Sequence, residues 1–293
     1  MKRIFLFVVT NLAVLALLSV VLFIVERVFG VHLAQGGMGG LLVFAAIFGF
    51  GGSLISLAMS KWTAKRMMGV RVITAPQSDL ERWLLATVKH LADQAHIGMP
   101  EVGIFDSAEM NAFATGARRN AALVAVSSGL LRSMSRSQAE AVLGHEITHV
   151  ANGDMVTLAL LQGVLNTFVI FLARIIGSFV DRALFKNERG QSGIGFFLTT
   201  MVAQIVLGVF ASVIVCWYSR RREFRADRGG ADLAGMGSMI DALQALKRSQ
   251  GEPMPPQMQA FGINTGSTHG VMRLFMSHPP LDERIAALQT STG

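Results

Sequence analysis

The sequence predicts a mainly α-helical membrane protein with a small β element and about four transmembrane helices. Of its 293 residues, 52% are apolar and only 15% are charged, whereas soluble domains carry about 25% charged residues. Four long runs contain no charged side chain, and each approaches the roughly 20 helical residues that cross a hydrocarbon core. These runs are residues 4–25, 39–59, 155–173 and 194–218. An ordinary soluble protein is therefore excluded.

Basic residues flank the apolar runs and predict the topology, because positive side chains are retained on the cytoplasmic side. They precede the first run and follow the second and the last. They are Lys2, Arg3, Lys61, Lys65, Arg66, Arg220, Arg221 and Arg222. The first run is longer than the roughly 7–15 apolar residues of a signal peptide, so we expect a retained anchor. The N-terminus and both polar segments are then predicted to lie in the cytoplasm.

The chain is predicted to divide into two hydrophobic hairpins and two polar segments. These are an N-terminal transmembrane hairpin (1–60), a polar segment (61–154), a second hydrophobic hairpin (155–218) and a polar tail (219–293). Gly49, Gly51 and Gly52 predict close helix packing in the first hairpin. Arg174, directly after the third run, indicates a shorter span, a snorkelling side chain or one that faces the protein interior. The single cysteine, Cys216, is expected to be a small buried apolar residue.

The first polar segment carries signals for both kinds of secondary structure. Apolar residues recur with helical periodicity over 80–95. Short strands are predicted at 102–105 and 123–126, and 111–115 is a candidate third strand. Residues 137–140 match a capping box, which predicts that a helix opens there and carries the motif described next.

His145-Glu146-Ile147-Thr148-His149 is an H-E-x-x-H motif on this predicted helix. Positions i and i+4 are about 40° apart around a helix, so both imidazoles can reach one metal ion from one face. Glu146 lies beside that face, where it can take a proton from a water on the metal. Neutral imidazole suits zinc, and a catalytic zinc site needs a third protein ligand and an open position. The alternative is a helix with two surface histidines.

The third ligand is predicted to be a carboxylate elsewhere in the chain. A metzincin extension would place Gly at 152 and His at 155, where this chain has Asn152 and Met155. The best candidate is Glu223, and Asp227 lies one helical turn further on, where it can accept a hydrogen bond from a ligand imidazole. Taken alone, this pair is better explained as a charged helix face that follows a membrane span. Beside the two histidines it predicts a gluzincin-like zinc protease domain with one Zn²⁺ per chain.

At this point the sequence resembles the HtpX-type membrane metalloproteases, relatives of the CAAX prenyl proteases. The likeness covers nearly the whole chain, including H-E-I-T-H, the hydrophobic hairpin after it and R-R-E-F-R-A-D. It also includes Asn-Ala-Phe-Ala at 111–114, Asn-Gly-Asp at 152–154 and Ser-His-Pro-Pro at 277–280. Together these motifs are highly specific.

The resemblance implies a multi-pass stress protease of the bacterial inner membrane, with its active site facing the cytoplasm. It implies that the substrates are misfolded or damaged membrane proteins held in or near the lipid bilayer. It further implies zinc bound by His145, His149 and Glu223, with Glu146 as the catalytic base. The composition and the spacing of residues do not give the substrate class.

Two further groups of residues are candidates for substrate contacts. Asn111, Ala112, Phe113 and Ala114 are expected to form an edge strand that holds an extended substrate through main-chain hydrogen bonds. His278 is expected either to polarise the scissile carbonyl or to be structural, with Pro279 and Pro280 starting the last helix.

Two other functions compete with the endopeptidase: an intramembrane protease and a zinc transporter. An intramembrane-cleaving protease would carry the motif inside a span, but the helix before the motif is polar. A non-enzymatic zinc transporter would distribute ionisable residues through several spans, and these are scarce. The net charge of +7 follows from the basic flanks of the runs, so no nucleic-acid partner is expected. Two loops, at 185–195 and 251–270, are rich in small and polar residues, which are typical of sites of proteolytic nicking. The first is predicted to lie across the membrane from the zinc. The second is predicted to lie on the catalytic side, so it is the candidate for self-cleavage.

Overall fold

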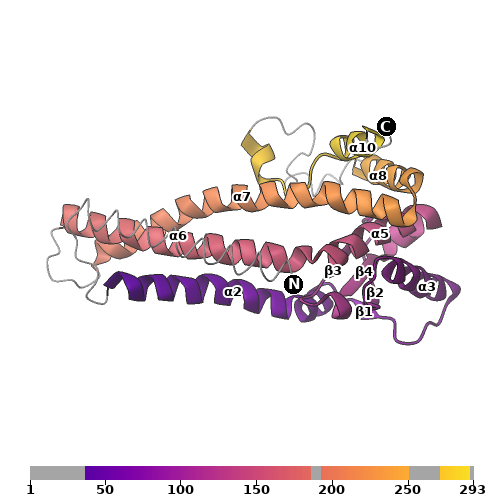
Figure 1. The fold of residues 1–293 in the computed structure, drawn as a ribbon, viewed down its shortest axis with the longest axis horizontal. Coiled ribbons are helices and arrows are strands. Elements are labelled where there is room, and N and C mark those ends of the chain that lie inside the picture. The colour runs from indigo at the N-terminus through magenta and orange to yellow at the C-terminus, as the bar shows by residue number, and fades with distance from the viewer. Residues whose placement is uncertain (1–36, 186–192, 251–270, 291–293) are drawn as a thin grey trace. The chain divides into compact units, whose positions relative to one another are not determined.

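The structure is a computed structural model, and it describes residues 37–185, 193–250 and 271–290 (Figure 1). The predicted first span at 4–25 lies outside these residues. The chain forms two compact units. One holds the residues up to Ser56 and Leu158–Val215, and the other holds Leu57–Thr157 and the residues from Cys216 onward. The predicted four-segment division stays a prediction.

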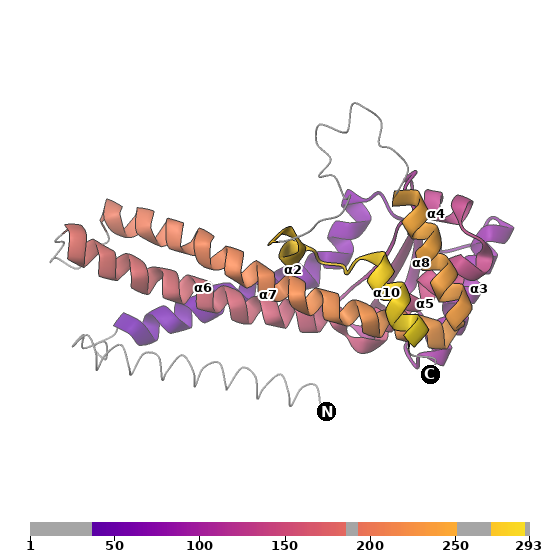
Figure 2. The same cartoon turned by 90° about the horizontal axis from the view of Figure 1, so that it is seen from above.

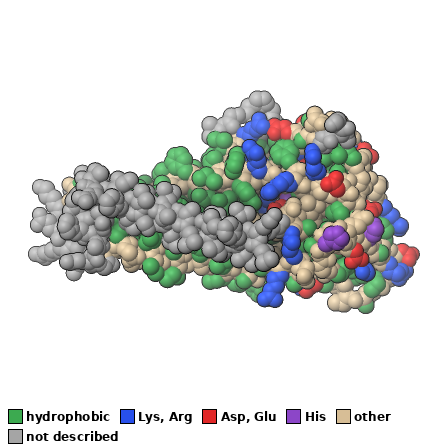
Figure 3. All heavy atoms as spheres, in the orientation of Figure 1, with side chains coloured by type: hydrophobic (Ala, Val, Ile, Leu, Met, Phe, Trp, Pro, Cys, Tyr) green, Lys and Arg blue, Asp and Glu red, His purple; other side chains and the backbone are tan. Residues whose placement is uncertain are grey.

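Three long helices carry most of the exposed large apolar side chains of the described residues. They are α2 (Gly37–Met67), α6 (Asp154–Phe185) and α7 (Ile194–Ala234). All three have the length and apolar composition needed to cross a membrane, so the three uncharged runs within the described residues form long apolar helices as predicted. On the face drawn in Figure 3, hydrophobic side chains gather over the long helices, while charged side chains lie over the unit that carries the sheet.

Close contacts within the first unit decide two of the sequence predictions. Helix α6 continues past Arg174, whose guanidinium lies 3.9 Å from the centroid of the Phe44 ring, so this side chain faces a neighbouring helix. A Cβ at Gly49 would collide with Thr167, as the packing prediction requires. An added Cβ at Gly51 or Gly52 would meet none of the described residues within 4 Å, so close packing at these two positions stays a prediction.

The second unit contains a four-stranded sheet of order β1-β2-β4-β3. The strands are β1 (Arg71–Val72), β2 (Glu101–Phe105), β3 (Ala112–Thr115) and β4 (Leu123–Ser127). Strands β2 and β4 are parallel, and the other two pairs are antiparallel. The three predicted strands are confirmed. Strand β1 was missed because two residues are too few to show alternation. Strand β3 is an edge of the sheet.

The core of the second unit lies between the sheet and two helices, α3 (Asp79–Gln94) and α5 (Arg136–Asn152). Fully buried Leu84, Val88 and Leu91 of α3 pack in one cluster with Leu143 and Ile147 of α5. Leu143 and Ile147 of α5 thus face the sheet side, and the residues between them are directed elsewhere. This packing turns the two motif histidines toward the other side of α5.

Helix α5 begins two residues earlier than the sequence predicts. Its N-cap is Ser135, whose hydroxyl accepts the backbone N–H of Gln138, while the Gln138 side chain accepts the backbone N–H of Ser135. Both Ser135 and Ser137 satisfy the capping-box pattern. The prediction that residues 137–140 form the capping box was therefore wrong. Of the two overlapping matches in the sequence, the first, Ser135 with Gln138, makes the two hydrogen bonds.

Five short elements complete the described part of the second unit. They are η1 (Arg119–Ala121), α4 (Ser128–Ser133), α8 (Met236–Gln250), η2 (Val271–Phe275) and α10 (Leu281–Thr290). Met239 and Leu243 of α8 and Leu288 of α10 share a buried cluster with Ala139 and Val142 of α5, and Figure 2 shows α8 and α10 beside α5. These contacts hold α10 close to the helix that carries the motif histidines.

Candidate active site

A close approach of α5 and α7 brings the candidate site residues together. An added Cβ at Gly230 would lie 2.9 Å from the backbone nitrogen of His145, and one at Gly229 would collide with the Thr148 side chain. At Gly144, an added Cβ would lie 3.3 Å from the Gly230 carbonyl oxygen. Only residues without a side chain allow this separation. Sequence reasoning did not single out this contact, although two adjacent glycines inside a helix are a usable signal.

Three side chains converge where these helices meet. The Nε2 atoms of His145 and His149 lie 3.1 Å apart. Glu223 Oε2 is 3.6 Å from the first nitrogen, and Glu223 Oε1 is 3.3 Å from the second. All three residues are buried, with Glu223 only 1% exposed. They are a group of residues that could hold one metal ion.

Each imidazole is also held from behind by a carboxylate. His145 Nδ1 lies 2.9 Å from Asp227 Oδ1, and His149 Nδ1 lies 2.7 Å from Asp154 Oδ2. A carboxylate accepts, so each Nδ1 donates, and we assign the tautomers on that basis. In the neutral rings both Nε2 lone pairs then face the centre of the site. This is the arrangement by which carboxylates orient metal-binding histidines.

The position of Asp154 follows from the end of α5. Gly153 caps this helix in the left-handed conformation, with φ of 67°, which favours glycine. The chain turns there, and Asp154 begins α6 with its side chain directed back at His149. Sequence reasoning noted Asn-Gly-Asp only as part of a resemblance and missed this role. A helix-ending Asn-Gly followed by an acidic residue was the available signal.

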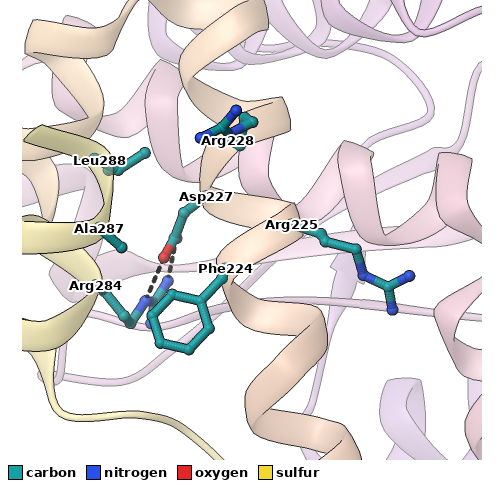
Figure 4. A pocket seen from close by; sticks show the side chains of 7 residues that line it. All are labelled: Phe224, Arg225, Asp227, Arg228, Arg284, Ala287 and Leu288. Carbon is teal, nitrogen blue, oxygen red and sulfur yellow. Dashed lines mark hydrogen bonds and ion pairs between the residues drawn. The ribbon is translucent and has the colours of Figure 1, made fainter. Parts of the chain in front are cut away.

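Arg284 of α10 completes the polar cluster and was also missed. Its Nε donates to Asp227 Oδ2 at 2.8 Å and its Nη2 donates to Asp227 Oδ1 at 2.5 Å, a two-bond fork that Figure 4 shows. Its side chain is buried, and Nη1 lies 3.7 Å from Glu223 Oε2. The fork fixes the carboxylate that holds His145. A pocket of about 210 Å³ adjoins it, lined by Phe224, Arg225, Asp227, Arg228, Arg284, Ala287 and Leu288.

The other predicted residues lie as follows. His278 Nδ1 is 2.8 Å from Glu223 Oε2, and its side chain is 61% exposed, so it borders both the cluster and solvent. Glu146 is half-buried on α5, and its carboxylate makes no hydrogen bond or ion pair with any described residue.

The segment 111–114 reaches the site through its strand. Ala112, Phe113 and Ala114 belong to β3, which contacts α5. Asn111 precedes the strand, where its backbone N–H donates to Ser127 Oγ. The segment is therefore an edge strand adjacent to the motif helix.

The electrostatics of the cluster favour a cation. Burial lowers the pKa of His149, but its hydrogen bonds to Asp154 and Glu223 more than offset this and raise the pKa to about 9. Burial likewise lowers the pKa of His145, and its hydrogen bonds to Asp227 and Glu223 raise it above its usual value. Positive charge at the centre of the site is thus stabilised by the surrounding carboxylates.

The donor set also fits a divalent metal. Glu223 Oε1 is buried and makes no hydrogen bond of normal geometry with any described residue, although it lies 3.3 Å from His149 Nε2. Ligand atoms about 2.0–2.1 Å from a tetrahedral zinc ion lie about 3.3 Å from one another. The two nitrogens lie 3.1 Å apart, and each lies 3.3 or 3.6 Å from a different oxygen of the Glu223 carboxylate, which is close to that value. Two nitrogens and one oxygen are a ligand set of catalytic zinc.

Comparisons with known proteins decide the family. The model of peptidase family M48 matches residues 78–292. The chain belongs to peptidase family M48. It is 62% identical over 295 residues to Protease HtpX of Alkalilimnicola ehrlichii, covering 99% of this chain and 98% of that one. It is 61% identical over 293 residues to the Protease HtpX homolog of Thiobacillus denitrificans, covering 99% of both.

A solved structure agrees with this fold. The crystal structure of Ste24p from S. mikatae matches with a TM-score of 0.60 and 19% identity, covering 96% of this chain and 66% of that chain. At this identity the likeness shows the fold alone. Family membership and the three apolar helices make the chain a multi-pass inner-membrane metalloprotease that acts on proteins. The motif helix α5 is not among the candidate spans of the described residues.

Proposed function

We propose that this M48 member is a zinc endopeptidase that degrades misfolded or damaged membrane proteins at the cytoplasmic face of the membrane. His145, His149 and Glu223 would hold one zinc ion, and Glu146 would be the catalytic base. The observation that carries the proposal is the convergence of two imidazole nitrogens and one carboxylate in a buried cluster. The HtpX names of the relatives support the substrate class.

The described residues divide the chemistry among them. Zinc, when bound, polarises the scissile carbonyl and the attacking water. Glu146 has a free carboxylate beside the cluster, so it is placed to accept a proton from that water and to deliver it to the leaving nitrogen. Asp227 and Asp154 keep both imidazoles in the ligand tautomer. His278, with its exposed ring, is placed to donate a hydrogen bond to the developing oxyanion.

Strand β3 is the proposed substrate-binding edge. It pairs with β4 on one side only among the described strands, so its other side offers backbone groups to an extended peptide. Such pairing reads the main chain and accepts many sequences, which suits a protease for unfolded segments. Because α5 is not among the candidate spans, cleavage outside the hydrocarbon core is favoured over the intramembrane alternative.

Zinc uptake is expected to depend on pH. The metal-free imidazoles hold a proton below their raised pKa, about 9 for His149, and zinc must displace it. Zinc affinity should therefore fall as the pH falls from 9 to 6, by roughly tenfold per pH unit for each proton displaced. Titration of the metal-stripped protein in two buffers of different ionisation enthalpy measures affinity, proton release and stoichiometry. A pH-independent affinity, or more than one ion per chain, would contradict the proposed ligand set.

The proposed topology places 61–154 and 219–293 in the cytoplasm, on account of the basic residues that follow α2's apolar run and the apolar part of α7. We expect a membrane-impermeant thiol reagent to leave Met110→Cys and Ala260→Cys unlabelled in intact cells, in a Cys216→Ser background. Gln191→Cys, on the loop predicted to lie across the membrane, should be labelled. Lysed cells provide the accessibility control. Labelling of position 110 or 260 from outside would reverse the topology.

Self-cleavage is the third expected behaviour. Detergent-solubilised protein supplied with zinc is expected to be cut within or near 251–270, a stretch rich in small and polar residues that lies outside the described residues. A Glu146→Gln copy incubated alone should remain whole. Mass spectrometry of the two proteins after incubation makes the comparison. Equal fragmentation of both would assign the cut to a contaminating protease, and an intact wild type would refute self-cleavage.

A further inference from the structure

The short helix η2 is fastened to one turn of α7 by its backbone. Arg220 Nη1 donates to the carbonyl oxygens of Leu274, at 3.2 Å, and Met276, at 2.6 Å. The Cys216 thiol donates to the Phe275 carbonyl oxygen at 3.3 Å. The thiol is half-exposed, so the prediction of a buried apolar cysteine was wrong. Figure 1 shows η2 as the short gold helix beside α7.

The turn of α7 that holds η2 has a definite place in a bilayer. Cys216 belongs to the last turn of the uncharged run 194–218. Arg220 lies one helical turn further on, about 6 Å along the axis. Trp and Tyr side chains concentrate at the membrane–water boundary, and Trp217 and Tyr218 occupy this interval. Because η2 is bonded to both ends of this turn, it must lie at the same depth.

At that depth η2 and α7 display large apolar side chains. Trp217 is 51% exposed, Leu274 45% and Phe275 44%. The Arg221 guanidinium lies 5.3 Å from the Trp217 ring centroid and is itself exposed. In water this apolar surface would be unfavourable. At the lipid boundary the apolar groups meet acyl chains and the guanidinium meets phosphate.

We propose that Trp217, Arg221, Leu274 and Phe275 form an interfacial lipid anchor whose occupant is the headgroup–acyl boundary of anionic phospholipid. Phe275 is three residues before His278, which contacts Glu223. The anchor therefore ties the chain segment that leads to His278 to the membrane surface. The bilayer is thereby a structural partner of the segment that borders the candidate metal cluster. This inference concerns lipid contact and is independent of the proposed proteolysis.

Nitroxide depth measurements test the anchor directly. The full chain with Cys216→Ser, which keeps a donor for the Phe275 carbonyl, is labelled at Phe275→Cys and reconstituted in vesicles of phosphatidylethanolamine and phosphatidylglycerol. Collision with oxygen reports lipid, and collision with a water-soluble nickel chelate reports solvent. Phe210→Cys, at an exposed position of the apolar run, and Glu109→Cys, at an exposed position of the loop before β3, are the lipid and water references.

We expect the oxygen-to-nickel ratio of the label at 275 to exceed that at 109 by several-fold and to fall below that at 210. The same ordering is expected for Leu274→Cys. The reference labels show in each preparation that the protein is inserted and folded. A ratio at 275 equal to that at 109 would place η2 in water. Low collision with both reagents at 275 would show that protein covers the patch. Either result would overturn the anchor.

Discussion

Replacing Glu146 with Gln is expected to reduce cleavage of an unfolded membrane protein by at least about 100-fold, the usual contribution of a general base. The amide keeps nearly the same shape but cannot accept a proton from water. The metal content should not change, because the Glu146 carboxylate is not one of the three converging groups. Substrate cleavage by gel densitometry and metal content by mass spectrometry are measured on the same preparation.

The matched control for this variant is Glu140→Gln, which makes the same chemical change on the same helix, six residues earlier. It should cleave at the rate of the wild type. Substantial cleavage by the Glu146→Gln protein, with Glu140→Gln also active, would show that another group accepts the proton. Loss of metal from Glu146→Gln would instead make this carboxylate part of the ligand set.

Removal of the third candidate ligand is expected to lower zinc content and activity together. In Glu223→Ala the two imidazoles face a site without its carboxylate, and two nitrogens alone make an incomplete catalytic zinc set. The variant should retain less than stoichiometric zinc at any concentration that saturates the wild type. Zinc titration of the stripped protein, followed by the cleavage assay, measures both losses.

Asp227→Asn is the comparison that separates a ligand from its support. Its carboxylate contacts His145 Nδ1 and the Arg284 fork, so its loss should weaken affinity or activity by about 10–100-fold rather than abolish zinc binding. Thermal unfolding of both variants shows whether either effect is a loss of fold. Full zinc retention by Glu223→Ala would assign the third ligand to another carboxylate, and a larger loss in Asp227→Asn would exchange the two roles.

Most of the fold was predictable because its signals are local. An uncharged run of about 20 residues has few alternatives to a membrane helix, and the three runs within the described residues form α2, α6 and α7. The strands at 101–105 and 123–127 are short apolar segments bounded by turns. Helix boundaries were less certain, because overlapping capping patterns at Ser135 and Ser137 cannot be ranked without the surrounding structure.

The centre of the site was predictable for a different reason. His145 and His149 are placed together by helix geometry alone, and a metal needs a third ligand, so Glu223 could be sought. Asp154 and Arg284 could not be found in this way. The first depends on the left-handed turn at Gly153, and the second comes from α10, which is far along the chain and packs beside α7. Contacts of this kind are products of tertiary packing and leave no periodic trace in the sequence.

The central claim is that one zinc ion at the cluster of His145, His149 and Glu223 is required for peptide-bond cleavage. The most direct test is cleavage of an unfolded membrane protein by the purified full chain in lipid vesicles. The activity is measured as isolated, after removal of metal by a chelator, and after titration with zinc. The account predicts complete loss on chelation and full recovery at one zinc ion per chain, with no recovery in Glu223→Ala. Undiminished cleavage by fully stripped protein would contradict it.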